Sequence, residues 1–178
     1  MSYYGATELA AAFRTVRANT IQIAEDIPEN EYDFKPAPDC RSVAQTLVHL
    51  AVAYPGMQMQ IQQNGLTDLT TFNFMEVLQK AAAEEARPRS KSEIVALLKS
   101  EGDTFASYLE GLSDPFLAER VSGAQPPPRT RFEMLLSVKE HEMHHRAQLM
   151  MMERMLGIVP HLTRQMQERM AARAAAAR

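Results

Sequence analysis

Residues 130–156 decide the fold, and they read TRFEMLLSVKEHEMHHRAQLMMMERML. Thr130 is a typical helix N-cap, and Gly157 and Pro160 end the pattern at its other side. Apolar residues recur along the stretch at spacings of three and four, as on a helix that packs one face against a core. The stretch therefore predicts one long helix with a buried side.

The preceding sequence predicts three more long helices, separated by proline-punctuated connections at 27–39 and 113–128. We expect these helices at about 7–26, 42–63 and 90–112, with an interruption at Pro55 in the second. A shorter helix is expected at 72–85. No segment alternates apolar and polar residues as a half-buried strand does. The sequence predicts an all-α fold, a four-helix bundle over residues 1–161 followed by an Ala/Arg-rich helical tail at 162–178.

Composition excludes several classes of protein. The chain has 178 residues, 46% hydrophobic and 23% charged, and a net charge of −3, which fits one globular domain without the basic excess of a nucleic-acid binder. It holds no apolar run of about 18 residues, so we expect no membrane span. Its start has no basic segment before the apolar stretch, so we expect no signal peptide. One cysteine, Cys40, excludes an internal disulfide. We expect a cytoplasmic protein with neither nucleic-acid nor membrane partners.

Two histidines in the long helix carry the first indication of chemistry. His141 and His145 are four residues apart, so their imidazoles lie on one face, one helical turn apart. Two ring nitrogens in that arrangement can reach one metal ion at about 2.0–2.1 Å. Their stripe also contains Val138 and Leu149, which assigns both histidines to the buried face. His144 is rotated by roughly 100° and falls on the flank.

His49 is the candidate third ligand. It lies in the middle of the second expected helix, among apolar neighbours. A lone histidine in such a place is usually a satisfied core residue. Three neutral imidazoles meeting inside a bundle each need a partner, however, and a divalent ion satisfies three lone pairs at once. From the residues alone, ordinary packing and a three-histidine metal site stay open as alternatives.

The same helix also spells H-E-x-x-H at residues 141–145, the zinc-protease pattern in which the glutamate, here Glu142, is the general base. The extended protease pattern needs a glycine and a third histidine, but Gln148 and Met151 stand there. The other form needs a downstream carboxylate, for which Glu168 in the tail is the main candidate. We therefore disfavour a protease.

Two motifs resemble a known family. Residues 41–50, RSVAQTLVHL, look like the start of the second helix in the DinB/YfiT-like superfamily, and residues 141–149, HEMHHRAQL, are similar to its later His-x-x-His-His-Arg-Gly-Gln signature. Ala147 departs from that pattern, where glycine is common. The proline-containing loop at 27–38 and the exit at 157–160 also fit. The resemblance implies a four-helix bundle with a three-histidine metal site on His49, His141 and His145.

Three histidine ligands leave at least one coordination position open, which favours chemistry over a purely structural metal. Zinc, nickel, iron and manganese all bind imidazole, so the sequence predicts one divalent ion without choosing among them. The resemblance implies a metal-dependent thiol S-transferase that uses a low-molecular-weight thiol and a small electrophile. A non-catalytic metal-binding stress-response protein is the alternative, and a metal-hydroxide hydrolase is a weaker one.

Other candidates carry less weight. Glu142 is a weak candidate for proton transfer, although an inter-helix role is more usual for such a residue. Gln148 is a weak candidate for holding a ligand water on the inner side of its helix. Cys40 lies in a loop that can reach the mouth of the site, although a neutral thiol without a role is favoured.

The chain also has more apolar helix surface than four inner faces need. The extra surface comes from a methionine-rich flank of the long helix and from a stripe in the tail, Leu162, Met166 and Met170. Exposed patches of this kind usually mark an interface, so we expect a homodimer.

Overall fold

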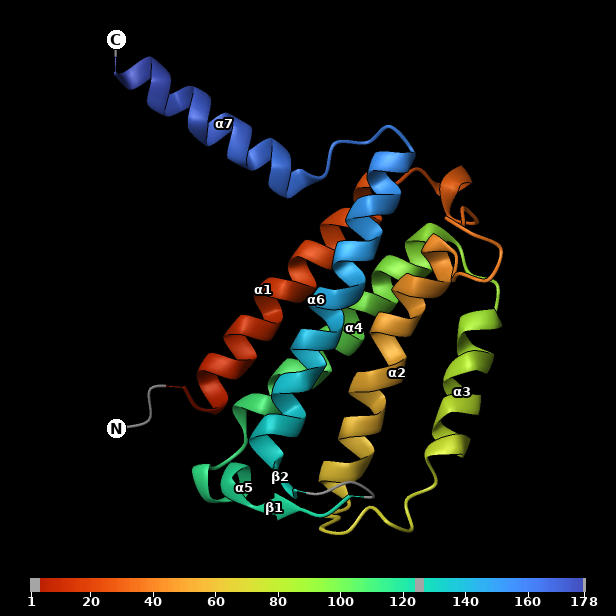
Figure 1. Cartoon of the computed structure of the whole chain (residues 1–178), viewed down its shortest axis with the longest axis vertical. Helices are drawn as coiled ribbons and strands as arrows, with labels where there is room; N and C mark the ends of the chain where they lie inside the picture. Colours follow the sequence, from red (N-terminus) through yellow and green to blue (C-terminus); the bar gives the residue numbers. More distant parts are fainter. Residues whose placement is uncertain (1–3, 124–126, 178) are drawn as a thin grey trace.

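Helices make up most of the chain in the computed structural model, which describes residues 4–123 and 127–177 (Figure 1). Short strands are the only other regular elements in this described part. In chain order the elements are α1 (Ala6–Asp26), the 3-10 helix η1 (Glu29–Glu31), α2 (Val43–Gln63), α3 (Phe74–Ala86), α4 (Lys91–Glu110), α5 (Asp114–Ala118), β1 (Arg120–Val121), β2 (Arg129–Thr130), α6 (Arg131–Met155) and α7 (His161–Ala176).

The four long helices α1, α2, α4 and α6 form the predicted bundle. Each of α1 and α2 packs against both α4 and α6, so α1 and α2 occupy opposite corners although they follow each other in the chain. In Figure 1, α1 and α6 run in one direction and α2 and α4 in the other. The connection from α1 to α2 therefore crosses the end of the bundle. Helix α3 lies outside the four and packs against α2.

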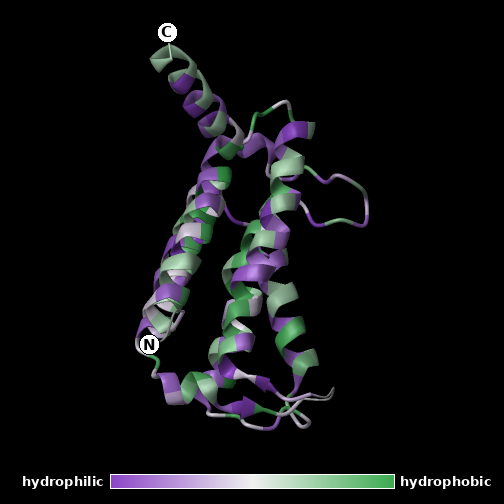
Figure 2. Cartoon of the chain, turned by 60° about the vertical axis from the view of Figure 1, so that its left-hand side comes forward, coloured by the Kyte–Doolittle hydropathy of each residue, from purple (hydrophilic) through white to green (hydrophobic). Residues whose placement is uncertain are grey.

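Apolar side chains from all four helices fill the interior. One cluster, at the end where α1 finishes, includes Ile23, Leu47, Leu98 and Leu149. A second cluster lies nearer the start of α1 and includes an edge-to-face pair of Phe13 and Phe105, whose ring centroids are 4.9 Å apart. Hydrophobic and hydrophilic residues alternate along each helix in Figure 2, as expected for amphipathic helices with one buried face.

Helix starts follow the capping signals in the sequence. The hydroxyl oxygens of Ser42, Ser90 and Thr130 each accept a hydrogen bond from the backbone N–H three residues later, and a Glu or Gln side chain returns the contact. The predicted ends of the long helices agree with the structure to within two residues. Pro55, expected to interrupt the second helix, lies inside a continuous α2.

The expected connection at 113–128 contains more structure than the sequence suggests. Ser113 caps the short α5, and β1 then pairs antiparallel with β2. Residues 124–126 of that connection lie outside the described part. Two-residue strands are too short to produce a recognisable alternation of apolar and polar residues, so no pattern in the sequence predicts them.

A buried arginine joins all four helices of the bundle. The guanidinium of Arg17, on α1, donates to both carboxylate oxygens of Glu142 on α6, to the carbonyl of Leu98 on α4 and to that of Leu50 on α2, at distances of 2.9–3.1 Å. Gly102 makes room for it, because a Cβ there would lie 2.8 Å from the Arg17 side chain. The ion pair is almost fully buried, with side chains 4% and 2% exposed.

The buried face of α6 is therefore not centred on His141 and His145, as the sequence analysis expected. Glu142, and not His141 or His145, is the residue of this turn that faces the core; it is 2% exposed, whereas both histidines are half-buried. The stripe is rotated because a carboxylate paired with a guanidinium is satisfied inside the bundle. The histidines then face the groove between α6 and α2.

Helix α7 projects from the end of the bundle in Figure 1. Beyond the buried His161 its side chains are half-buried or exposed. Among the described residues, no helix combines the length and apolar character needed to cross a membrane.

The Arg17–Glu142 pair yields a stability prediction. Changing Glu142→Ala leaves the guanidinium buried without its counter-charge, so we expect the free energy of unfolding to fall by about 3–5 kcal/mol. Urea denaturation measures the change. Glu110→Ala is the matched control, because it breaks the exposed pair with Arg14 and is expected to cost about 1 kcal/mol or less. Equal losses in the two variants would contradict the role given to the buried pair.

The predicted homodimer stays a prediction, and exposed methionines show where to test it. Met151 and Met155 on α6 and Met166 and Met170 on α7 are each more than half exposed. Light scattering at micromolar concentration is expected to give twice the mass of the chain, and Met166→Lys combined with Met170→Lys to give the monomer mass. A monomer in the unaltered protein would remove the inference.

Candidate metal centre

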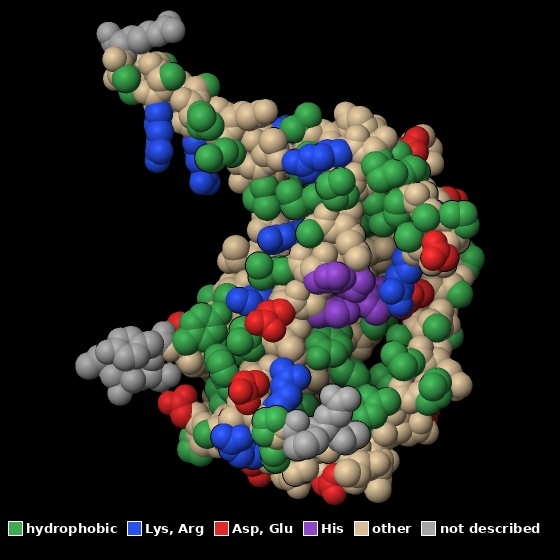
Figure 3. Space-filling model, in the orientation of Figure 1, with side chains coloured by type: hydrophobic (Ala, Val, Ile, Leu, Met, Phe, Trp, Pro, Cys, Tyr) green, Lys and Arg blue, Asp and Glu red, His purple; other side chains and the backbone are tan. Residues whose placement is uncertain are grey.

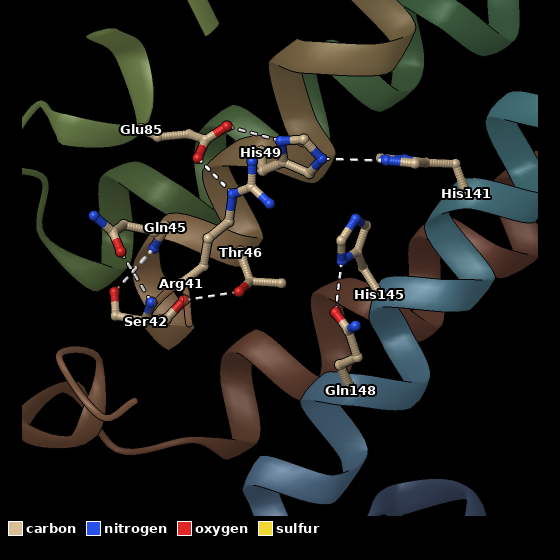
Figure 4. A network of polar contacts seen from close by, with 9 residues as sticks. All are labelled: Arg41, Ser42, Gln45, Thr46, His49, Glu85, His141, His145 and Gln148. Atoms are coloured by element: carbon tan, nitrogen blue, oxygen red, sulfur yellow. Dashed lines mark hydrogen bonds and ion pairs between the residues drawn. The ribbon is translucent and has the colours of Figure 1, made fainter. Parts of the chain in front are cut away.

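Three histidines from two helices meet at one point. His49 comes from α2, and His141 and His145 come from α6; one nitrogen of each ring lies within 4.8 Å of the other two. Figure 3 shows the histidine side chains of this face as one patch at the surface, and Figure 4 shows the three rings turned toward a common space. The structure thus brings together the three residues that the sequence singled out.

Helix packing accounts for this meeting. α2 and α6 are neighbours in the bundle, and the two histidines of α6 are one turn apart on the side that faces α2. The ring centroids are 4.6–5.0 Å apart in all three pairs. The ring of His141 also packs on Tyr54, at 4.8 Å between centroids, and the Tyr54 hydroxyl is bonded to Ser137 across the α2–α6 groove.

Hydrogen bonds orient two of the rings from behind. Nδ1 of His49 lies 2.7 Å from a carboxylate oxygen of Glu85, and Nδ1 of His145 lies 2.7 Å from Oε1 of Gln148. Each of these oxygens is an acceptor, so each Nδ1 carries the proton and donates it. The lone pair of each ring is therefore left on Nε2, the atom free to bind an ion.

The protonation of the three imidazoles favours cation binding. Burial is the main cause that lowers the pKa of His49, His141 and His145. For His141 the mutual repulsion of the neighbouring histidines adds to burial, and its pKa falls to about 3. Neutral imidazole is the form that ligates a metal, so at neutral pH the three rings are ready to do so.

The spacing of the rings fits a divalent ion. Nε2 of His49 and Nε2 of His141 lie 3.2 Å apart. Two imidazole nitrogens that bind one tetrahedral ion at about 2.0–2.1 Å are separated by about 3.3 Å. The donor set, three neutral nitrogens with two of the rings held from behind, is the kind that zinc, nickel, iron and manganese accept. It supplies three ligands, fewer than the four of a closed structural zinc site.

A cavity of about 700 Å³ opens beside His145. Its wall is mainly apolar, with polar groups at intervals, and the predicted site residue Gln148 is part of it. The lining residues are Pro36, Asp39, Cys40, Arg41, Thr46, His145, Gln148, Met151, Met152 and Met155. Cys40 and the exposed Met151 and Met155 of α6 thus line this cavity.

The other two histidines are not members of the three-histidine cluster, although the ring of His144 packs on that of His145 at 4.9 Å between centroids. His144 is exposed and its Nε2 is 3.2 Å from Nε2 of Gln148, which donates to it. His161 is buried at the start of α7, where its Nε2 is bonded to Asn19.

Glu142, the weak candidate for proton transfer, faces away from the three rings. Both of its oxygens are occupied by Arg17, and one also accepts from Thr20, inside the bundle. A protease general base must reach a water bound at the metal. Glu168, the candidate third ligand of that scheme, is exposed on α7. The geometry thus supports the inter-helix role for Glu142.

Glu85 is the site residue that sequence reasoning missed. It belongs to α3, outside the bundle, and no spacing relates it to either histidine motif. The one signal in the sequence is weak: two consecutive acids, Glu84 and Glu85, stand in the last turn of a helix, where the helix dipole disfavours negative charge.

The fold and the site together define a class, a helical bundle with three histidines at the groove between two of its helices. A family model, the DinB superfamily, matches residues 12–149. The chain belongs to that superfamily, as its two motifs suggested. No functionally curated protein matches it in sequence.

Solved structures agree on the fold. YfiT from Bacillus subtilis, described as a probable metal-dependent hydrolase with an unusual four-helix bundle topology, is 17% identical, with a TM-score of 0.67 over 89% of this chain and 91% of that one. A DinB-like protein from Bacillus subtilis is 21% identical, with a TM-score of 0.63 over 84% and 92% of the two chains. A mycothiol-dependent maleylpyruvate isomerase is 11% identical, with a TM-score of 0.63 over 82% of this chain and 61% of that one. Identities this low support the fold alone.

Metal content tests the ligand set. We expect one divalent ion per chain in the unaltered protein and almost none in His49→Ala, His141→Ala or His145→Ala, because two imidazoles hold an ion far more weakly than three. Elemental analysis after gel filtration measures this. His144→Ala is the control and is expected to keep its metal. Full metal in His49→Ala would refute the three-histidine site.

Proposed function

We propose that the protein is a metal-dependent enzyme that activates a small thiol for attack on a small electrophile. The cavity beside His145 carries the proposal, because a ligand set with an open position next to about 700 Å³ of accessible space is arranged to admit a substrate. A non-catalytic metal protein needs no such space. The cavity therefore counts against the alternative of a non-catalytic stress-response protein.

The chemistry follows from the donor set. A divalent ion on three neutral imidazoles keeps its charge and, when bound, would hold a thiol as thiolate at neutral pH. In the reaction the sulfur forms a bond to carbon, and an epoxide C–O bond or a carbon–halogen bond breaks. The proton of the thiol passes to solvent as the thiolate forms; a halide then leaves as the anion, whereas an epoxide oxygen takes up a proton from water.

The protein's own residues position the reactants. Glu85 and Gln148 hold His49 and His145 so that both Nε2 atoms face the centre. The methionines of α6 offer polarizable surface that suits sulfur ligands and apolar electrophiles, and they limit the access of water to one side of the cavity. Arg41, whose side chain is partly exposed, lines the same cavity and can hold an anionic group of a substrate.

Hydrolysis by a metal-activated water is the second candidate, supported by the likeness to YfiT with its description as a probable metal-dependent hydrolase. Glu142 is turned into the core and Glu85 is bonded to His49 and Arg41, so neither is placed to take a proton from water in the cavity. Asp39, in the cavity wall, is the carboxylate left for that role.

Cobalt substitution tests the thiol directly. In the cobalt protein, added low-molecular-weight thiols are expected to produce a sulfur-to-metal charge-transfer band in the near ultraviolet, and the same thiols to support turnover of epoxides or alkyl halides. His144→Ala, the matched control, is expected to keep the band, and His145→Ala to lose it.

Two results would redirect the assignment. If no thiol in the panel gives the band or supports turnover, the thiol mechanism is wrong. Metal-dependent cleavage of ester or amide substrates by the same preparation would then establish the hydrolase.

A further inference from the structure

Glu85 contacts the metal centre from outside the bundle. One of its carboxylate oxygens lies 2.7 Å from Nδ1 of His49, and the other accepts a hydrogen bond from Nε of Arg41 at 2.6 Å. Its side chain is 10% exposed. Figure 4 shows Glu85 behind the His49 ring, on the side opposite His141. The carboxylate is thus held at both oxygens while one of them touches a candidate ligand.

The contact with His49 determines which nitrogen of the ring is free. A carboxylate accepts and cannot donate, so Nδ1 of His49 must carry the proton. Nε2 is then bare, and it is the atom that faces His141. A neighbouring negative charge also makes the imidazole a stronger donor to a cation, as carboxylate–histidine pairs do behind many metal sites.

Arg41 fixes the carboxylate in this position. Its Nε–H holds the oxygen that His49 does not use, so Glu85 cannot rotate away from the ring without breaking an ion pair. Arg41 directly precedes Ser42, the N-cap of α2, which places its side chain at the start of the helix that carries His49. Glu85 on α3 is thus held between Arg41, just before the start of α2, and His49 in the middle of α2.

The local structure of α3 gives an independent reason to look for a role. Glu84 and Glu85 lie in the last turn of α3, which contains no basic residue, and negative charge there is opposed by the helix dipole. The only residue of α3 that is buried, Ala81, contributes little apolar area. A residue that conflicts with its local helix commonly serves the site it contacts.

We propose that Glu85 is a positioning residue of the metal centre, which holds His49 in the Nδ1–H tautomer and strengthens its Nε2 as a ligand. This inference rests on the metal site of the proposed function, but not on the thiol. It assigns α3, a helix outside the bundle, a part in metal binding.

Metal affinity is the first test, with zinc alone as the probe and a chelating dye as competitor. Glu85→Gln keeps an oxygen that can accept from Nδ1 but removes the charge, and Glu85→Leu removes both. We expect both variants to bind zinc more weakly, by about 10- to 100-fold, with Glu85→Leu the weaker. Glu84→Gln is the matched control, because Glu84 is the neighbour of Glu85 in the sequence but pairs with Arg89 and not with His49. The zinc affinity of this variant is expected to equal that of the unaltered protein.

The tautomer of His49 is the second test and needs no metal. Nitrogen NMR of the metal-free protein distinguishes a protonated Nδ1 from a protonated Nε2. We expect the Nδ1–H form in the unaltered protein and in Glu85→Gln, and loss of that preference in Glu85→Leu. A purely structural role would leave the tautomer unchanged, and circular dichroism with thermal unfolding confirms that each variant is folded.

The outcomes distinguish a failure of the role proposed for Glu85 from a failure of the metal site itself. Zinc affinity of folded Glu85→Leu equal to that of Glu84→Gln, or an Nε2–H tautomer in the unaltered protein, would overturn the role of Glu85. If the unaltered protein binds no metal, the metal site of the proposed function fails, and the tautomer measurement still decides whether Glu85 orients His49.

Discussion

The guanidinium of Arg17 contacts every other long helix of the bundle, and the position of the histidines depends on it. Its partners are a carboxylate on α6 and two main-chain carbonyls, those of Leu50 on α2 and Leu98 on α4. Leu50 follows His49 in the chain, and Glu142 follows His141. One buried charge therefore sets the relative height of α2 and α6 at the level where their histidines must meet. Because an unpaired charge in the core is so costly, a slipped arrangement of these helices is strongly disfavoured.

The three rings differ in how they are supported. His49 is held by a charged acceptor, His145 by a neutral amide, and His141 by packing on Tyr54. In the absence of an ion, Nε2 of His49 is bare, so the proton between the two Nε2 atoms belongs to His141. To ligate an ion through Nε2, His141 must shift this proton to Nδ1, a change of tautomer that keeps the ring neutral, and its low pKa, which concerns the gain of a second proton, does not oppose the step. The side of the centre toward His145 stays open to the cavity.

Much of the fold could be predicted from the sequence, because its signals are local. Capping residues such as Ser42, Ser90 and Thr130 specify helix starts through hydrogen bonds to residues only three positions away. The spacing of His141 and His145 specified a shared face in the same way. The sequence pattern centres the buried face of this helix on His141 and His145, whereas the structure centres it on Glu142. A carboxylate can occupy that buried position only because the distant Arg17 pairs with it. Arg17 is 125 positions away, and Glu85 is 36 positions from His49, so neither partnership leaves a periodic trace.

Helix α3 buries only Ala81 and packs against one helix of the bundle. Segments with so little buried surface open locally at a small fraction of the free energy of global unfolding. Opening α3 withdraws Glu85 from His49 while the Arg17 contacts and the bundle core stay intact. On the role proposed for Glu85, His49 would hold an ion more weakly while α3 is open, which would link exchange of the ion to the stability of a peripheral helix.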